Sequence, residues 1–496
     1  MRRLLTAADF TARGVCQRVG IESVYDFRSI REGRKTAVET RDRLDLLIRL
    51  FMDVELIDLS EVREVLSPDA VYTLESLGLL SPYRSDPSRC HATVLLYPTA
   101  SLWIISDLNV SPAGPAETSI PEDAVYPAIT GNTRHFLSSL PTTPCDSFLE
   151  LCAGTGIAAL QASRYARRTW AADITERATS FARFNAALNG IENCTAVQGD
   201  LYQPVAGQRF DRIVAHPPYM PSLEQKYIFR DGGEDGEQIT RRIFAGLPDH
   251  LEAGGRFYCT CMMTDRVGAR AEERIRAMLG ERADEFDVVV VGLQTFQPTE
   301  YYFRLALAGR ATLDEVARRH EIFARLEVEQ LLYCSMVVQR HAVARPPFTC
   351  RRQAGPDSGV DGVEWLVQWE GAVAGSDPTD WLLAARPRAS PSARMRLSHV
   401  QRDGEWLVDE CRLTTSFPFV VEAVCPPWVG TLLARADGGP TTLDHLDFLK
   451  RGGALPPDAP EAEFARLVRS LVAGGFLEVP EHPLPAARVS PVPEAS

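Results

Sequence analysis

An α/β fold with a doubly wound, seven-stranded and mostly parallel sheet is the fold class that the sequence predicts for the middle of the chain. Three observations predict it. Short apolar strands alternate with helical stretches from about residue 128 onward, glycines follow the first strand, and acidic residues stand at the ends of several strands. This alternation is typical of a parallel sheet covered by helices on both faces. The strands are expected at 146–152, 168–173, 194–198, 210–215, 256–262, 286–292 and 332–339.

Length and composition bound the rest of the chain. A chain of 496 residues corresponds to about three domains. Hydrophobic residues make up 45% and charged residues 24%, the mix of an ordinary globular protein. A net charge of -13 disfavours a protein that binds polyanions over its whole surface, although a local basic face stays open.

The N-terminal part, residues 1–110, is expected to form a helical or winged-helix-like module. Leu44, Leu47, Ile48 and Phe51 have the spacing of one apolar helix face. A second helical stretch is expected over 59–80, followed by a ribbon of strands at 92–97 and 102–105. Such modules bind DNA or mediate protein contacts, and the sequence leaves both open. Residues 111–127 are rich in proline and read as a linker.

The α/β catalytic domain is expected over residues 120–342, and an α+β extension follows it. Residues 343–415 are expected to be strand-rich, with Trp365 to Trp369, Trp381 to Ala385 and Trp406 to Val408 as the candidate strands. Residues 416–479 are expected to be helical and to form a second winged-helix-like module that ends in a strand at 476–479. Residues 480–496 hold five prolines and are expected to be a disordered tail.

The cysteines and the N-terminus indicate a cytoplasmic protein. Eleven cysteines are scattered without a C-x-x-C pair or a His/Cys cluster at zinc spacing. They are expected to be reduced, and no metal site is expected. The N-terminus lacks the apolar run of a signal peptide, and no apolar stretch is long enough to predict a membrane span.

The first motif follows the first strand of the sheet. Residues 148–156 read Phe-Leu-Glu-Leu-Cys-Ala-Gly-Thr-Gly, an apolar strand that ends in an acid and turns through glycines into a helix. Glycines let the backbone approach a ligand closely. The alternative is a tight turn that binds nothing.

Acidic residues also end the next two strands. Asp173 stands at the end of the second strand, where a carboxylate can accept hydrogen bonds from ribose hydroxyls. The alternative is a helix cap, because a helical run follows Asp173 directly. Asp200 ends the third strand. Three acidic strand ends at one edge of a sheet predict a nucleoside pocket, and the absence of a full G-x-G-x-x-G turn argues against a dinucleotide.

The fourth strand runs into His216, Pro217, Pro218 and Tyr219. Prolines fix the backbone, so its carbonyls are held rigidly, and the tyrosine ring offers a flat face to a planar target. Residues 231–236, Asp-Gly-Gly-Glu-Asp-Gly, follow shortly afterwards, before an amphipathic helix.

These motifs, in this order, resemble those of class I S-adenosylmethionine-dependent methyltransferases of the methyltransferase small domain type. Release-factor glutamine N5-methyltransferases and the amino-methyltransferases of RNA and DNA bases carry D/E-x-G-x-G-x-G, N-P-P-Y and D-G-G-x-D-G motifs. The resemblance implies a methyltransferase that uses S-adenosyl-L-methionine, with a nitrogen of a protein or nucleic acid as the acceptor.

The resemblance also implies residue roles. Glu150 would hold the methionine part of the cofactor, Asp173 the ribose, and Asp200 with Leu201 the adenine edge. His216, Pro217, Pro218 and Tyr219 would meet the acceptor. The other cofactor-binding residues that the resemblance implies line the turn, the second strand end or the methionine end; they are Thr133, Cys152, Ala153, Gly154, Gly156, Ile174 and His216 itself.

Two positions depart from the family pattern. Cys152 stands where the family has its first glycine, and His216 stands where the family has asparagine. A neutral histidine offers one acceptor nitrogen and an imidazolium none. His216 can therefore accept one hydrogen, act as a general base or mark a lost activity; the alternative is a structural histidine. With the ordinary histidine pKa, activity is expected to fall below about pH 6.

Two further functions stay open on the sequence alone. One is a small-molecule methyltransferase of secondary metabolism. The other is a catalytically silent, cofactor-binding regulatory protein, in which the flanking modules would carry the function.

Overall fold

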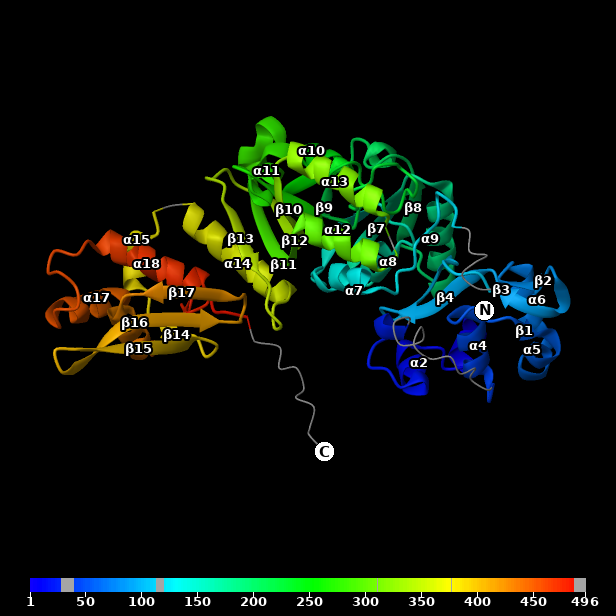
Figure 1. Cartoon of the computed structure of the whole chain (residues 1–496), viewed down its shortest axis with the longest axis horizontal. Coiled ribbons are helices and arrows are strands. Elements are labelled where there is room, and N and C mark those ends of the chain that lie inside the picture. The colour runs from blue at the N-terminus through cyan, green and yellow to red at the C-terminus, as the bar shows by residue number, and fades with distance from the viewer. Residues whose placement is uncertain (28–39, 113–119, 310, 376, 486–496) are drawn as a thin grey trace. The chain divides into compact units, whose positions relative to one another are not determined.

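The computed structural model describes residues 1–27, 40–112, 120–309, 311–375 and 377–485 (Figure 1). Most of the predicted tail lies outside the described residues, as do positions 113–119 of the predicted linker. None of the helices within the described ranges is both long and apolar enough to cross a membrane.

The largest sheet has eight strands in the order β13-β11-β12-β10-β9-β6-β7-β8. Strands β8, β7, β6, β9 and β10 are parallel, β11 and β12 are antiparallel, and β13 is parallel to β11. This is the class I methyltransferase order with one strand added at the edge, which confirms the predicted fold class. The strands are β6 Cys145–Leu151, β7 Ala166–Asp173, β8 Cys194–Gln198, β9 Phe210–Ala215, β10 Leu251–Arg266, β11 Phe286–Phe296, β12 Val328–Arg340 and β13 Thr349–Gln353.

All seven predicted strands are present, because each is an apolar run bounded by turn residues. Val288–Val291 in β11 is buried throughout, as expected for a strand covered on both faces. The eighth strand, β13, was not predicted, because its sequence Thr-Cys-Arg-Arg-Gln has no apolar pattern. The helices that alternate with the strands are α7 Gly131–Ser138, α8 Ile157–Ala162, α9 Glu176–Asn189, α10 Gln238–His250, α11 Ala271–Met278, α12 Pro298–Leu307 and α13 Leu313–Arg325, with 3-10 turns η3 Gln203–Val205 and η4 Gly280–Glu285.

The N-terminal region contains the predicted helices and ribbon. The predicted helical stretch 59–80 is two helices, α5 and α6, and the predicted ribbon is the antiparallel pair β4–β5. A three-stranded sheet, β1-β3-β2, was not predicted. The elements are α1 Arg2–Ala7, α2 Ala12–Val19, η1 Val24–Asp26, α4 Arg43–Phe51, β1 Ile57–Asp58, α5 Leu59–Val65, α6 Pro68–Ser76, β2 Leu80–Tyr83, β3 Asp86–Ala92, β4 Val94–Thr99 and β5 Leu102–Asp107.

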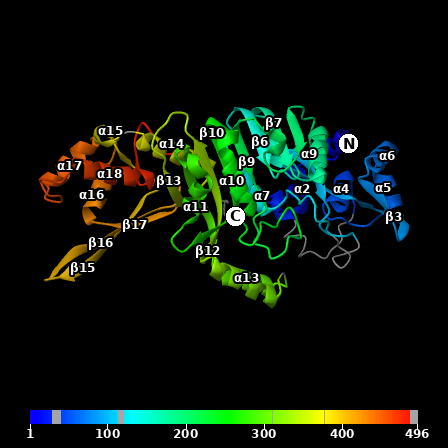
Figure 2. The ribbon, with the colours of Figure 1, turned by 90° about the horizontal axis from the view of Figure 1, so that it is seen from above.

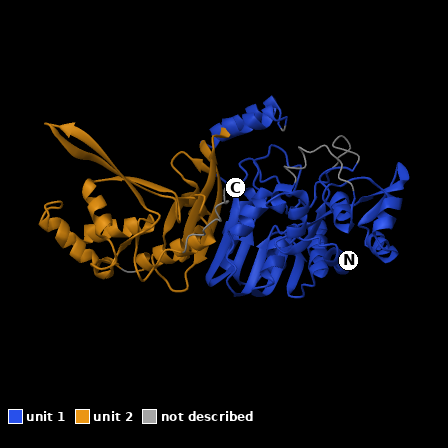
Figure 3. Ribbon diagram, turned by 90° about the horizontal axis from the view of Figure 1, so that it is seen from below, with its two compact units in different colours: residues 1–263, 299–327 blue, residues 264–298, 328–496 orange. Residues whose placement is uncertain are grey.

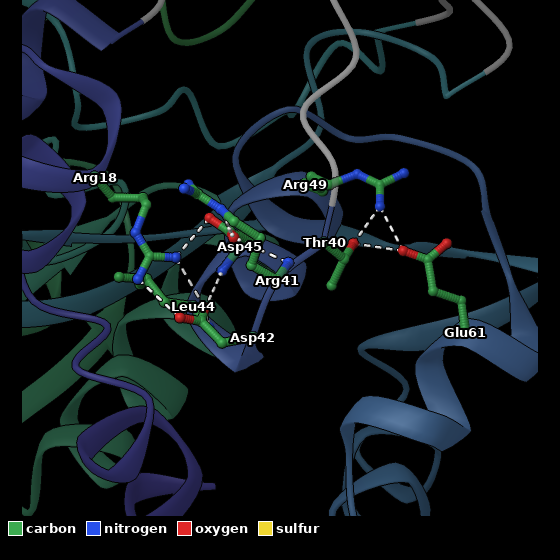
Figure 4. Close-up of polar contacts among 8 residues, drawn as sticks. All are labelled: Arg18, Thr40, Arg41, Asp42, Leu44, Asp45, Arg49 and Glu61. Carbon is green, nitrogen blue, oxygen red and sulfur yellow. Dashed lines mark hydrogen bonds and ion pairs between the residues drawn. The ribbon is translucent and has the colours of Figure 1, made fainter.

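Charged side chains connect the helices of this region (Figure 4). Arg18 of α2 binds Asp42 at 2.8 Å and the buried carboxylate of Asp45 at 2.6 Å. Arg49 of α4 binds Glu61 of α5 at 2.5 Å. Buried, hydrogen-bonded ion pairs fix the geometry of the elements that carry them, and their contribution to stability is small.

Two asparagines of α9 bind the outer edge of β5. The Asn185 amide accepts a hydrogen bond from Ile105 N at 2.8 Å and donates to Ile105 O at 3.2 Å. Asn189 repeats the pattern two residues along the strand: it accepts from Trp103 N at 2.9 Å and donates to Trp103 O at 2.7 Å. Asn185 also donates to the Thr155 carbonyl at 3.0 Å, inside the glycine turn. The β4–β5 ribbon is thereby attached to the helix beside the predicted nucleoside pocket.

The prediction of strands at 365–369 and 381–385 is wrong. Both segments are helices, α14 and α15, and only the third candidate, 406–408, is a strand. Trp365, Trp369 and Val373 are four residues apart and buried, which is the period of a helix; the shorter run alone resembled a strand. The elements are β14 Arg388–Ala389, β15 Arg394–Arg402, β16 Glu405–Thr415 and β17 Val421–Cys425, with helices α14 Val360–Ala374 and α15 Thr379–Ala384.

The helices expected after residue 416 are present. They are α16 Pro427–Arg435, α17 Thr442–Arg451 and α18 Glu461–Ala473, and the predicted last strand is β18 Leu477–Glu478, paired with β14. Strands β15 and β16 form a long antiparallel ribbon (Figure 2).

Two compact units make up the chain (Figure 3). Unit 1 comprises residues 1–263 and 299–327, and unit 2 comprises residues 264–298 and 328–496. All predicted site residues belong to unit 1.

Candidate functional site

The predicted site residues follow the carboxyl ends of neighbouring parallel strands. Leu151, the last residue of β6, pairs with Ala172 of β7 on one side and with Ala215 of β9 on the other. Asp173 pairs with Gln198, the last residue of β8. The glycine turn, Asp173, Asp200 and His216 therefore share one edge of the sheet, where ligands bind in open α/β sheets.

In the turn after β6, every second residue from Cys152 to Gly156 has a left-handed backbone conformation. The φ angles are 53° at Cys152, 52° at Gly154 and 76° at Gly156. A Cβ on Gly156 would lie 3.1 Å from the Ala182 Cβ, so this glycine lets α9 pack closely. A Cβ on Gly154 would meet only a Val125 methyl group, at 4.0 Å. The space beside Gly154 is thus open to a ligand.

Glu150 is tied to the helix that follows the turn. The residue is 3% exposed, and its carboxylate accepts hydrogen bonds from Ala158 N at 3.3 Å and Ala159 N at 2.8 Å, in the first turn of α8. Burial raises the pKa of the Glu150 carboxyl to about 8, while the two amides oppose that rise. The contacts make Glu150 an anchor between β6 and α8.

Asp173 holds the turn and is available to a ligand. One carboxylate oxygen accepts from Gly154 N at 2.9 Å, and the other accepts from Thr175 N at 3.1 Å. The Thr175 hydroxyl also donates to Oδ1, at 3.3 Å, whereas Oδ2 keeps a second lone pair. Burial raises the pKa of Asp173 above its ordinary value, and the amides of Gly154 and Thr175 counteract it. The cap at the start of α9 is the Thr175 side chain, so the alternative role of Asp173 as that cap does not apply.

The third strand end differs from the other two. Asp200 is paired with Arg242 of α10 at 2.6 Å, and both side chains are nearly half exposed. Leu201 has a φ of 51°, and Ile174 is 50% exposed at the neighbouring strand end. An exposed isoleucine beside a carboxylate offers a planar base an apolar face with a polar edge.

Aromatic rings surround His216. The Phe136 ring stacks on the imidazole at 5.3 Å and 22°, and the Tyr219 ring lies 5.7 Å away at 34°. His216 Nε2 is buried and has no hydrogen-bond partner among the residues that the structure describes. Burial lowers the pKa of His216 to about 4, so the imidazole is neutral near pH 7 and keeps one acceptor nitrogen. An acid limb near pH 6, expected from the ordinary pKa, is therefore no longer expected.

The segment 231–236 contacts the backbone of the His-Pro-Pro-Tyr loop. Gly232 N donates to Met220 O at 2.9 Å, and Met220 N donates to Arg230 O at 2.9 Å. A Cβ on Gly236 would lie 2.3 Å from Tyr219 O, so the two backbones are in direct contact. Asp231 is 2% exposed and accepts from Lys226 N and Tyr227 N. The Asp-Gly-Gly-Glu-Asp-Gly stretch is thus a backbone support for the residues that would meet the acceptor.

Helix α7 carries one residue of the predicted site, Thr133, and two further residues that contact the His-Pro-Pro-Tyr loop. Thr133 is buried, and its backbone N–H is capped by the Thr130 hydroxyl. Asn132 donates to the Tyr219 hydroxyl at 2.7 Å, and Phe136 is the ring stacked on His216. Four-residue spacing between Asn132 and Phe136, just upstream of the first strand, is a signal that sequence alone could have offered.

Another hollow, of about 710 Å³, lies in the N-terminal region and is lined by Arg18, Arg41, Asp42 and Glu61 among others. Several of its charged groups are paired within the protein: Arg18 with Asp42, Arg41 with Asp45, and Glu61 with Arg49. No group of three or more potential metal ligands is found within the described ranges.

A family model matches the part of the chain that forms this edge of the sheet. The model of the methyltransferase small domain matches residues 128–280. This segment is similar to the methyltransferase small domain. The match begins before α7 and ends after α11, so it covers the glycine turn, the acidic strand ends and the His-Pro-Pro-Tyr loop.

Curated relatives match about a quarter of this chain. A ribosomal protein uL3 glutamine methyltransferase of Bradyrhizobium diazoefficiens is 34% identical over 131 residues, 24% of this chain and 41% of the relative. A putative protein N5-glutamine methyltransferase of Methanocaldococcus jannaschii is 36% identical over 114 residues, 22% of this chain and 57% of the relative. A release factor glutamine methyltransferase of Moorella thermoacetica is 32% identical over 127 residues, 23% of this chain and 45% of the relative. The chain thus spans about half the length of these relatives.

Proposed function

We propose that the protein is an S-adenosylmethionine-dependent methyltransferase that methylates a nitrogen, and that its acceptor is the side-chain amide of a glutamine in another protein. The observation that carries the proposal is the His-Pro-Pro-Tyr loop at the end of β9, beside the glycine turn and Asp173. The relatives named above modify glutamine in a ribosomal protein and in a release factor. Both are proteins of translation, and a cytoplasmic location is part of the proposal.

The residues at the strand ends fit this cofactor. Asp173 Oδ2 has a lone pair for a ribose hydroxyl, Ile174 is exposed for the adenine, and the open side of Gly154 leaves room for the methionine end. The buried Nε2 of His216 has no hydrogen-bond partner within the described ranges, as expected where a second molecule completes the site. When bound, S-adenosylmethionine supplies an electrophilic methyl group. The protein's own residues then bind the cofactor and the acceptor and orient them toward each other.

The His-Pro-Pro-Tyr loop, residues 216–219, is called the acceptor loop below. It is suited to hold an N–H group. A neutral His216 can accept one hydrogen from an amide nitrogen and so direct the nitrogen's position. The phenol of Tyr219 stays protonated, because burial raises its pKa above the ordinary tyrosine value. A protonated phenol can donate to an amide oxygen, so this pair of residues matches the two polar ends of a carboxamide.

The N-terminal region is proposed to recognise the acceptor protein. Helices α5 and α6 are joined by a short turn and followed by the β2–β3 hairpin, the order of a winged helix, in which the second helix of the pair reads DNA. That helix, α6, reads Pro-Asp-Ala-Val-Tyr-Thr-Leu-Glu-Ser and has no basic residue. Tyr72 on it is 73% exposed. Without cations α6 is poorly suited to phosphate, and a protein partner is the better match.

Labelling in a lysate tests the proposal. The full chain is incubated with methyl-labelled S-adenosylmethionine and a lysate of a strain that lacks the gene. We expect the label in protein, in N-methylated glutamine after hydrolysis. Label in small molecules or in nucleic acid would overturn the proposed acceptor. Cofactor binding by calorimetry without labelling of any fraction would replace the enzyme with a regulatory cofactor-binding protein.

A further inference from the structure

Helix α7 contacts both side chains that would meet the acceptor. Asn132 and Phe136 are four residues apart and therefore lie on one face of the helix. The Asn132 amide donates to the Tyr219 hydroxyl at 2.7 Å, and the Phe136 ring stacks on His216. Phe136 is 2% exposed, so the stack is part of the core.

The helix is held independently of the acceptor loop. Thr130 caps its first turn, and the Ala128 N–H donates to the Tyr97 hydroxyl of β4 at 2.6 Å. At the other end, the Ser139 hydroxyl lies 3.4 Å from the Thr260 hydroxyl of β10. A helix fixed at both ends can impose an orientation on the side chains that it contacts.

We propose that Asn132 is a positioning residue for Tyr219: it occupies a lone pair of the phenol oxygen and so directs the phenolic hydrogen toward the acceptor. The proposal rests on the proposed function. A phenol has one hydrogen to donate and accepts through its oxygen. While Asn132 donates to that oxygen, the Tyr219 hydrogen is not used on Asn132.

A purely structural role for Asn132 makes the opposite prediction for one substitution. Asn132 is the second residue of α7, where a negative charge is favourable to a helix. Asn132→Asp keeps the shape of the side chain, but a carboxylate can only accept, so it would take the Tyr219 hydrogen for itself. If Asn132 serves only the helix, this variant should be as active as the wild type. If Asn132 positions Tyr219, the variant should lose activity while staying folded.

The test compares label transfer from methyl-labelled S-adenosylmethionine to lysate protein by the full-length wild type and its variants. We expect Asn132→Asp to lower the maximal rate about tenfold, with an unchanged melting temperature and with cofactor affinity within twofold of the wild type. In a Tyr219→Phe background the same substitution should change the rate less than twofold, because the oxygen that it acts on is gone. Gly131→Asp is the matched control: it adds the same charge one residue earlier, at a position where a Cβ meets nothing within 4 Å.

Each outcome decides a different point. Full activity of Asn132→Asp, or equal losses in the Asn132→Asp and Gly131→Asp variants, would overturn the role of Asn132 and leave the proposed function intact. A tenfold loss that persists in the Tyr219→Phe background would show that Asn132 does not act through Tyr219. A wild type that binds cofactor and labels nothing would overturn the proposed function itself, and this role with it.

Discussion

At the ends of β6 and β7 the carboxylates of Glu150 and Asp173 accept hydrogen bonds from backbone amides. At the end of β9 the chain instead presents aromatic rings and the His216 Nε2, which has no partner in the described part of the chain. In the first region, nearby backbone N–H groups donate hydrogen bonds to both carboxylates. The second depends on neighbours from elsewhere in the sequence, namely α7 and residues 231–236. Cofactor binding should therefore tolerate substitutions around the acceptor loop. Substitutions in the two regions should affect cofactor affinity and turnover separately.

The largest effect is expected where the two backbones touch. In Gly236→Ala a methyl group would lie 2.3 Å from Tyr219 O, so the acceptor loop must move. Turnover should fall at least a hundredfold, with cofactor affinity by calorimetry within threefold of the wild type. Gly207→Ala is the control, because Gly207 also has a positive φ, 77°, but no atom within 4 Å of its Cβ. Parallel losses of affinity and turnover would show that the two regions are not separate.

His216→Ala should come next. Removing an acceptor or base that acts in the transition state typically costs about a hundredfold in rate. The expected result is this loss in labelling rate with an unchanged dissociation constant for cofactor. His216→Asn, which restores the family's residue, should retain more activity than His216→Ala. An alanine variant at the wild-type rate would leave His216 as a structural histidine.

Asp173→Ala should weaken cofactor binding. The dissociation constant for S-adenosylmethionine should rise about tenfold, which corresponds to about 1.4 kcal/mol and is typical of one lost hydrogen bond to a charged group. Calorimetry measures it. Asp146→Ala is the control, because Asp146 lies near the start of β6, at the opposite edge of the sheet, and its side chain is 76% exposed. Unchanged affinity in Asp173→Ala would remove the ribose role of this carboxylate.

The pH profile should show a smaller effect. Burial lowers the pKa of His216 to about 4, so its neutral, hydrogen-accepting form persists as the pH falls and is lost only near pH 4. The labelling rate should stay within about twofold between pH 5 and pH 7, while circular dichroism shows a folded protein. A half-maximal rate near pH 6 that is absent in His216→Asn would mean that the imidazole titrates as if exposed.

The smallest expected effect concerns Cys152. A side chain at a φ of 53° costs about 1 kcal/mol. Cys152→Gly should raise the free energy of unfolding by about that amount, without a change in cofactor affinity. Cys152→Ala keeps a Cβ at the same φ and should bring no such gain, which chemical denaturation can show.

The sequence predicted most reliably those features that a few neighbouring residues determine. The strands β6, β7, β9 and β11 are apolar runs between turn residues, and their order along the chain is enough to predict a parallel sheet. Local pattern failed at α14, where two tryptophans beside Leu366 and Val367 resembled a strand although the longer spacing is helical. It also failed at β13, a strand formed by pairing with β11 rather than by apolar residues.

The same distinction holds for the site. The motif residues were visible because each lies at the end of a strand. The importance of Asn132 and Phe136 comes from contacts with Tyr219 and His216, which lie 87 and 80 positions away, and these contacts cannot be read from the neighbouring residues. Likewise, the downward shift of the His216 pKa depends on burial by distant side chains, which the sequence around position 216 does not reveal.

The two asparagines of α9 have a consequence for how the protein behaves in a crowded solution. A ribbon such as β4–β5 has an edge whose unpaired amides and carbonyls can recruit a strand from another molecule, the usual start of aggregation. Asn185 and Asn189 pair with Trp103 and Ile105 along that edge as a further strand would. A helix side chain, unlike a strand, presents no new edge behind it. Two amide groups thereby block the growth of a sheet between molecules at the β5 edge of this ribbon.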